Sequence, residues 1–126
     1  MINQLTAHET ADLILSGEIS SGEAVEACLE RIDTVEPVLH SFIEVDREGA
    51  LETARGIDRR IKKGENPGKL AGVPVALKDI YCVQGKEVTC GSRILKGFRA
   101  PYDATVIRKL REEGAVFIGQ IGRAHV

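Results

Sequence analysis

Residues 70–80 carry the clearest strand signal of the chain, and they read Leu70-Ala71-Gly72-Val73-Pro74-Val75-Ala76-Leu77-Lys78-Asp79-Ile80. The apolar run over residues 73–77 predicts a short buried strand. The run ends abruptly on Lys78 and Asp79. An unpaired buried ammonium is costly and tends to lose its proton, so Lys78 either points into water or lies in a polar pocket as a proton acceptor. This stretch alone leaves both alternatives open.

The composition is that of a soluble globular domain or part of one. The chain has 126 residues, 43% of them hydrophobic and 29% charged, and a net charge of -2. Such a balance gives no sign of a nucleic-acid surface, and no apolar run reaches the roughly 18 residues of a membrane span. Cys28, Cys82 and Cys90 lack the spacing of metal ligands. We interpret them as reduced, which predicts a cytoplasmic protein without a metal site.

Residues 1–68 are predicted to be mostly helical. Thr6 with Glu9, and Ser20 with Glu23, form two capping boxes that each begin a helix. The second helix has an apolar stripe at positions 25, 28, 29 and 32, which predicts one buried face. Pro37 is expected to end that helix by residue 36.

The pattern after residue 38 alternates between strands and helices. Residues 39–45 predict a strand, and Asp46 predicts the cap of a helix with apolar residues at positions 50, 51, 54, 57 and 61. Asp103 predicts the cap of another helix, which ends at Gly114 before a buried strand over residues 115–118. This order predicts an α/β fold, with the start of the sheet core in residues 69–120.

The strand ending in Lys78-Asp79 resembles the lysine motif of the amidase signature family. Within that family the chain is similar to the A subunits of bacterial aspartyl/glutamyl-tRNA amidotransferases. Supporting stretches occur in matching order: Leu5-Thr6-Ala7-His8-Glu9, Ser20-Ser21, Arg31-Ile32-Asp33, Ala50-Leu51, Thr89-Cys90-Gly91-Ser92, Pro101-Tyr102-Asp103-Ala104-Thr105 and Gly114-Ala115-Val116. The resemblance implies the N-terminal part of an α/β/α fold around a mixed sheet.

The resemblance also implies amide chemistry by a Ser-cisSer-Lys triad, with Lys78 as its catalytic lysine. Proteins of this kind release ammonia from glutamine, and the ammonia amidates Glu-tRNA(Gln) or Asp-tRNA(Asn) in an ATP-driven reaction. The implied partners are the B and C subunits of a heterotrimeric amidotransferase, with tRNA reached through the B subunit. No cofactor is expected in this chain, and ATP and Mg are expected to be used by the assembled complex.

The chain departs from the family pattern in lacking both serines of the triad. We therefore expect a truncated chain that is inactive alone. Ser92 could be a dyad partner for Lys78, but the sequence offers no oxyanion hole for such a dyad. Thr89, Cys90 and Ser92 are instead expected to shape the wall of the lysine pocket, and Asp79 to bond local backbone.

The last six residues, 121–126, read Ile-Gly-Arg-Ala-His-Val. They can be back-translated as ATC GGA AGA GCA CAC GTC, a common sequencing-library adapter, and we interpret them as an artefact. The alternative is a genuine divergent C-terminus.

Two alternatives to the glutaminase hypothesis stay open from the sequence. The first is another amidase signature hydrolase that acts on small or aryl amides. The second is a non-catalytic α/β interaction module, in which Lys78 is an ordinary surface residue.

Overall fold

The computed structural model describes residues 1–122 and confirms the α/β class. Its strands form one mixed sheet in the order β1-β3-β2, with β1 at Phe42–Val45, β2 at Pro74–Lys78 and β3 at Val116–Ile121. The central strand, β3, pairs antiparallel with β1 and parallel with β2. The strand predicted from the opening stretch is therefore present, and it ends on Lys78.

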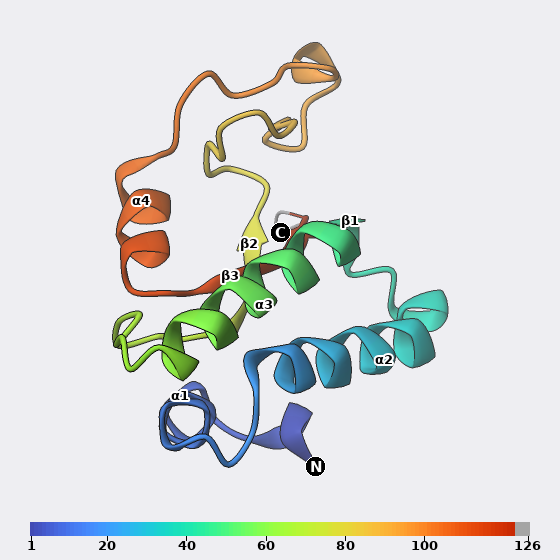
Figure 1. The fold of residues 1–126 in the computed structure, drawn as a ribbon. Helices are drawn as coiled ribbons and strands as arrows, with labels where there is room; N and C mark the ends of the chain where they lie inside the picture. The colour runs from blue at the N-terminus through green and yellow to red at the C-terminus, as the bar shows by residue number, and fades with distance from the viewer. Residues whose placement is uncertain (123–126) are drawn as a thin grey trace.

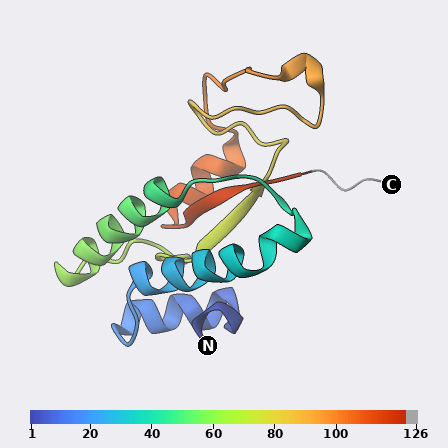
Figure 2. The ribbon, with the colours of Figure 1, turned by 90° about the vertical axis from the view of Figure 1, so that its right-hand side faces the viewer.

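Helices cover both faces of the sheet (Figures 1 and 2). The α-helices are α1 (Ala7–Ser16), α2 (Ser21–Leu39), α3 (Arg47–Lys62) and α4 (Thr105–Glu112). In Figure 2, α2 lies below the sheet with α1 beneath it, and α4 lies on the other side. The long connection from β2 to α4 extends beyond the carboxyl end of β2 and contains one short 3-10 helix, Arg93–Leu95. Within the described residues, no helix has the length and apolar composition needed to cross a membrane.

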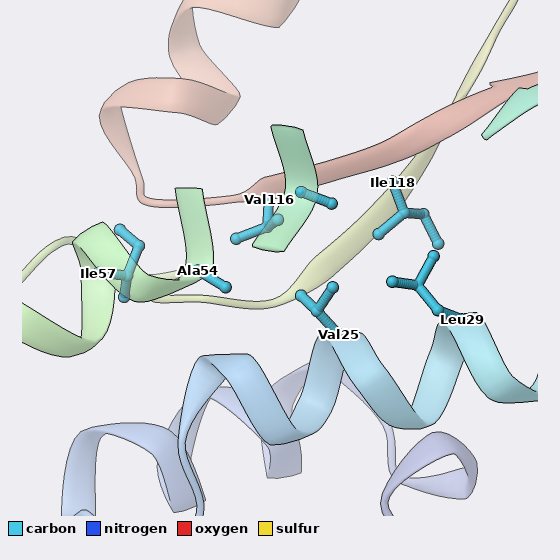
Figure 3. Close-up of a cluster of buried hydrophobic side chains, with 7 residues drawn as sticks. Val25, Leu29, Ala54, Ile57, Val116 and Ile118 are labelled. Carbon is cyan, nitrogen blue, oxygen red and sulfur yellow. The ribbon is translucent and has the colours of Figure 1, made fainter. Parts of the chain in front are cut away.

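The main core lies between α2, α3 and β3 (Figure 3). Its buried members come from these three elements: Val25, Leu29, Ala50, Ala54, Ile57, Val116 and Ile118. Cys28 and Ile32 pack against them, so the apolar stripe predicted for the second helix is confirmed. Burial of each large aliphatic side chain contributes roughly 1.5–3 kcal/mol, which makes this cluster the principal support of the sheet.

Both predicted capping boxes are present, but the predicted end of α2 is wrong. The side chains of Thr6 and Ser20 accept bonds from the N3 backbone in α1 and α2. Pro37 lies inside the last turn of α2, which continues to Leu39 and ends at His40 in a left-handed conformation with φ 50°. A proline so close to the helix end removes one backbone hydrogen bond without disrupting any following turn. As a result β1 begins at Phe42 rather than at residue 39.

Asp46 caps α3 as predicted, whereas Asp103 does not cap α4. The Asp46 carboxylate accepts a 3.1 Å bond from the Gly49 N–H. The N-cap of α4 is Ala104, which makes no side-chain capping bond. The Asp103 carboxylate is occupied elsewhere, because it accepts bonds from the Gln84 N–H at 2.7 Å and from Arg111 Nε at 3.1 Å.

Gly72 connects the start of β2 to the start of α2. Its φ is +73°, and a Cβ atom there would lie 2.5 Å from the Ser21 side chain. The buried Ser21 hydroxyl donates a 2.9 Å hydrogen bond to the Gly72 carbonyl. Only glycine permits both the left-handed backbone and this close approach.

The final segment is described only in part. Ile121 completes β3 and Gly122 follows it. Residues 123–126 lie outside the described residues. The interpretation of residues 121–126 as adapter-derived concerns the origin of the coding sequence and stays a prediction.

Candidate active site

Lys78 is the last residue of β2 and is half-buried. In the parallel ladder it pairs with Ile121, the last residue of β3, so the carboxyl ends of both strands meet beside it. Sheet edges of this kind are where α/β proteins place their ligands. The neighbouring Leu77 packs with Ile107 of α4, and Lys78 is therefore directed to the opposite face of the sheet. None of the ion pairs within residues 1–122 uses the Lys78 ammonium.

Asp79 follows directly and is 1% exposed. Its carboxylate accepts a 3.1 Å bond from the Thr89 N–H and a second bond from the Thr89 hydroxyl. Its backbone carbonyl accepts a 3.0 Å bond from the Cys90 N–H. Asp79 therefore bonds loop backbone, as the sequence predicts.

The segment Thr89-Cys90-Gly91-Ser92 forms a tight turn beyond the strand end. Cys90 has φ 51°, which is rare for a residue with a side chain. The Thr89 hydroxyl also accepts a 3.2 Å bond from the Gly91 N–H, while the Ser92 hydroxyl accepts a 3.3 Å bond from the Ile94 N–H. Within the described residues Ser92 makes no hydrogen bond with Lys78, and it caps the 3-10 helix instead. The geometry therefore gives no support to a Ser92–Lys78 dyad.

A cavity of about 130 Å³ lies between α3, β3 and the β2–α4 connection. Leu77 and Phe117 contribute to its apolar lining, and Gln120 to its polar lining. The register between β2 and β3 shifts after Phe117, which lets both Phe117 and Gln120 reach the same cavity. Lys78 is not among the residues that line it. The cavity therefore does not contain the predicted lysine pocket.

Two cations border this cavity, and both are paired. Lys86 Nζ lies 2.9 Å from the Asp46 carboxylate, and the Arg111 guanidinium lies 4.9 Å from the centre of the Phe117 ring. The Arg111 guanidinium also pairs with Asp103 at 3.1 Å. The partners in these contacts are not spaced at the repeat of a helix or a strand, so the sequence patterns do not predict the contacts.

The three cysteines are free, and in residues 1–122 no group of three His, Cys, Asp or Glu side chains could hold a metal ion. Burial raises the pKa of the Cys28 thiol, since a low-dielectric environment disfavours the thiolate. Cys28 is thus a packing residue of α2 rather than a nucleophile.

Residues 23–121 match the family described as Amidase. This match covers most of the chain and includes Lys78, Asp79 and the turn at residues 89–92. The chain belongs to the amidase signature family. The resemblance seen in the sequence motifs is therefore confirmed at the level of the family.

The curated relatives include components of amidotransferases. The chain is 52% identical over 117 residues to the A subunit of the glutamyl-tRNA(Gln) amidotransferase of Syntrophus aciditrophicus, covering 93% of this chain and 24% of that protein. It is 49% identical over 115 residues to the protein of the same name from Acidothermus cellulolyticus, covering 91% of this chain and 23% of that protein. The chain thus spans about a quarter of the length of these relatives.

Solved structures of the family share the fold. A bacterial aryl acylamidase of the amidase signature family superposes with a TM-score of 0.88 at 32% identity, covering 95% of this chain and 25% of that one. The arrangement of α1–α4 around the small sheet is therefore an amidase arrangement.

Proposed function

We propose that a protein containing this chain is the glutaminase component of a tRNA-dependent amidotransferase. It would release ammonia from glutamine for the ATP-driven conversion of Glu-tRNA(Gln) to Gln-tRNA(Gln), or of Asp-tRNA(Asn) to Asn-tRNA(Asn). The observation that carries this proposal is the higher identity to the A subunits of glutamyl-tRNA(Gln) amidotransferases, 52% and 49%, than to the aryl acylamidase, 32%.

Lys78 is the proposed base of a Ser-cisSer-Lys triad. Its neutral amine takes a proton from a bridging serine, which in turn deprotonates the nucleophilic serine. The nucleophile attacks the side-chain amide carbon of glutamine, and the departing nitrogen receives a proton and leaves as ammonia. Water then hydrolyses the glutamyl-serine ester to glutamate. Both serines and the oxyanion donors are expected outside these 126 residues, so the chain alone is proposed to be inactive.

The position of Lys78 supports this role. It ends a strand at the carboxyl edge of the sheet, half-buried, and no ion pair within residues 1–122 occupies its amine. A lysine engaged by a carboxylate would be held in the protonated form and could not accept a proton. The Lys78 amine is therefore available for a serine contributed by another segment.

The proposed partners are the B and C subunits of the complex, with tRNA bound through the B subunit and with ATP and Mg used by the whole assembly. We place the protein in the cytoplasm, where tRNA amidation occurs and where the three free cysteines would stay reduced.

The test is Lys78→Ala in the full-length protein assembled with its partners, with ammonia release from glutamine as the readout. Loss of a catalytic base predicts a fall in kcat of at least about 100-fold with an unchanged unfolding temperature. Lys69→Ala is the matched control, because Lys69 precedes the same strand and is exposed. Equal activity of the Lys78 and Lys69 variants would show that the protein is not an enzyme of this mechanism.

The second candidate is an amidase that hydrolyses small or aryl amides, and the superposition on the aryl acylamidase favours it. Comparing kcat/KM for glutamine with that for an anilide separates the two. A preference for the anilide, lost in Lys78→Ala, would support this candidate over the glutaminase. A non-catalytic interaction module predicts no hydrolysis of either substrate.

A further inference from the structure

Asp79 is a buried carboxylate without a cationic partner among the described residues. It is 1% exposed, and none of the ion pairs within residues 1–122 includes it. Burying an isolated carboxylate is costly, and hydrogen bonds from donors must offset that cost. Those donors are the N–H and the hydroxyl of Thr89. Asp79 and Thr89 therefore form one polar unit, which we call the Asp79–Thr89 pair.

The Asp79–Thr89 pair fixes the turn that follows it. The Thr89 hydroxyl donates to Asp79 and accepts from the Gly91 N–H at 3.2 Å. The Cys90 N–H donates to the Asp79 carbonyl at 3.0 Å, which holds Cys90 in its left-handed conformation. Such a conformation is strained for a residue with a side chain, and it persists only where the surrounding bonds maintain it.

The same residue fixes the end of the strand that carries Lys78. The Asp79 N–H donates to the Ile121 carbonyl at 2.9 Å, so the pairing of β2 with β3 continues one residue past Lys78. The Lys78 carbonyl accepts from the Tyr81 N–H at 3.2 Å. Asp79 therefore anchors the backbone directly after Lys78, through its N–H on the strand side and through its carboxylate and carbonyl on the side of the turn.

We propose that Asp79, acting through Thr89, is a positioning residue for Lys78. This inference rests on the proposed function, in which Lys78 accepts a proton from a serine. The Asp79–Thr89 pair touches neither the substrate nor that proton. It sets the direction of the Lys78 side chain by fixing the strand end, and a misplacement of about 1 Å can lower a catalysed rate by roughly 100-fold.

The experiment compares Thr89→Val with Thr89→Ser in the full-length protein, measuring kcat and KM for glutamine well below the unfolding temperature. Valine keeps the shape of threonine but has no hydroxyl to bond Asp79, whereas serine keeps the hydroxyl. We expect kcat to fall about 10- to 100-fold in Thr89→Val with KM within twofold, and to recover in Thr89→Ser. Thr10→Val is the matched control, because the buried Thr10 hydroxyl donates to the Thr6 carbonyl at the start of α1 and its loss should leave kcat unchanged.

Asp79→Asn is the second variant and replaces Thr89→Val if that variant does not fold. Its kcat and KM for glutamine are measured in the same way. Asparagine can accept the Thr89 N–H bond but lacks the negative charge that strengthens the hydroxyl bond, so an intermediate kcat is expected. A kcat within twofold of wild type in Thr89→Val, or in Asp79→Asn if only that variant folds, would overturn the inference.

Lys78→Ala distinguishes a failure of this inference from a failure of the proposed function. If Lys78→Ala is inactive and Thr89→Val has the kcat of wild type, the positioning role of Asp79 is rejected and the proposed function stands. If Lys78→Ala is active, the proposed function is rejected.

Discussion

Two regions of this molecule are held together by different forces. Between α2, α3 and β3, aliphatic side chains fill a continuous core (Figure 3). In the connection over residues 79–104, three carboxylates each accept a backbone N–H from a residue at least ten positions away: Asp79 from Thr89, Glu87 from Gly97 and Asp103 from Gln84. The core supports the sheet, and the carboxylates order the chain that surrounds the candidate active site.

The core is expected to determine the stability of the whole domain, whereas the bonds of the connection are expected to determine only the local order of that segment. Apolar burial is non-directional and cooperative, so its loss lowers the stability of the whole domain. A hydrogen bond to a loop fixes one contact, and its loss opens that segment while the core remains folded. Substitutions in the two regions should therefore differ in size and in kind.

The largest expected effect comes from Leu29→Ala. Leu29 is 1% exposed in the core, and its truncation should lower the free energy of unfolding by about 2–5 kcal/mol. Leu39→Ala is the control on the same helix, where the side chain is 62% exposed and the change should stay within about 0.5 kcal/mol. Urea unfolding followed by circular dichroism measures both. Equal losses for the two leucines would contradict the assignment of the core.

Gly72→Ala should have the next largest effect, because Gly72 joins the core to the strand that carries Lys78. Its φ of +73° alone costs alanine about 1–2 kcal/mol, and the Cβ would lie 2.5 Å from Ser21. Gly17→Ala provides the control for backbone strain, since Gly17 has φ +81° with nothing within 4 Å of a Cβ. Both variants carry the cost of a positive φ, so the difference between their unfolding free energies measures the steric clash between the new Cβ at position 72 and the Ser21 side chain. Gly17→Ala should be the milder change, and the reverse order would mean that α2 and β2 do not meet as described.

Asp103→Ala should act locally. The Asp103 carboxylate accepts the Gln84 N–H at 2.7 Å and pairs with Arg111, and removing it should cost about 1–2 kcal/mol at most. Amide hydrogen exchange is the informative measurement, because exchange should accelerate at Gln84 and not at the β3 amides that pair with β2. Uniform acceleration across both regions would show that the connection and the core unfold as one unit.

The sequence predicted the apolar region better than the polar one. Periodic positions such as Val25 and Leu29 indicate one buried face of a helix, and the capping box at Ser20 indicates its start, so the sequence alone predicts where α2 begins and which face it buries. Pro37 does not mark the end of α2, because a proline removes a backbone hydrogen bond only within its own turn and Pro37 lies in the last turn of the helix.

The contacts of Asp103 and Lys86 could not be predicted for a different reason. A carboxylate before a helix has the same sequence signature whether it caps that helix or bonds a distant loop. Asp103 bonds Gln84, nineteen positions earlier, and Lys86 pairs with Asp46 across forty positions. Only the closure of the fold brings such pairs together. The motif around Lys78 can be recognised in the sequence because it is local, whereas the bonds that fix the end of its strand join residues that only the fold brings together.

The smallest expected effect lies at the capping box of α1, which belongs to neither region. Hydrogen bonds from the Thr6 backbone and hydroxyl lower the pKa of the fully exposed Glu9 carboxyl from its ordinary value of 4.5. A carboxyl with a lowered folded pKa contributes stability above pH 4.5, and that contribution is lost as the pH falls through the folded pKa. Glu9→Gln should therefore lower the unfolding temperature slightly at neutral pH and leave it unchanged in acid, where both side chains are neutral.

Thermal unfolding at about pH 7 and at a pH well below the folded pKa of Glu9 checks this sign, with Glu18→Gln as the control for a general change in charge. Glu18 follows α1 and is exposed, but it is outside the capping box. If the two glutamine variants respond alike to pH, the effect reflects net charge, and the capping box contributes nothing measurable. If only Glu9→Gln responds, a fully exposed hydrogen bond stabilises the end of a helix even where burial contributes nothing. That result would show that the cap of α1 contributes to the stability of the whole domain, whereas the loss of a bond in the connection over residues 79–104 is expected to open that segment alone.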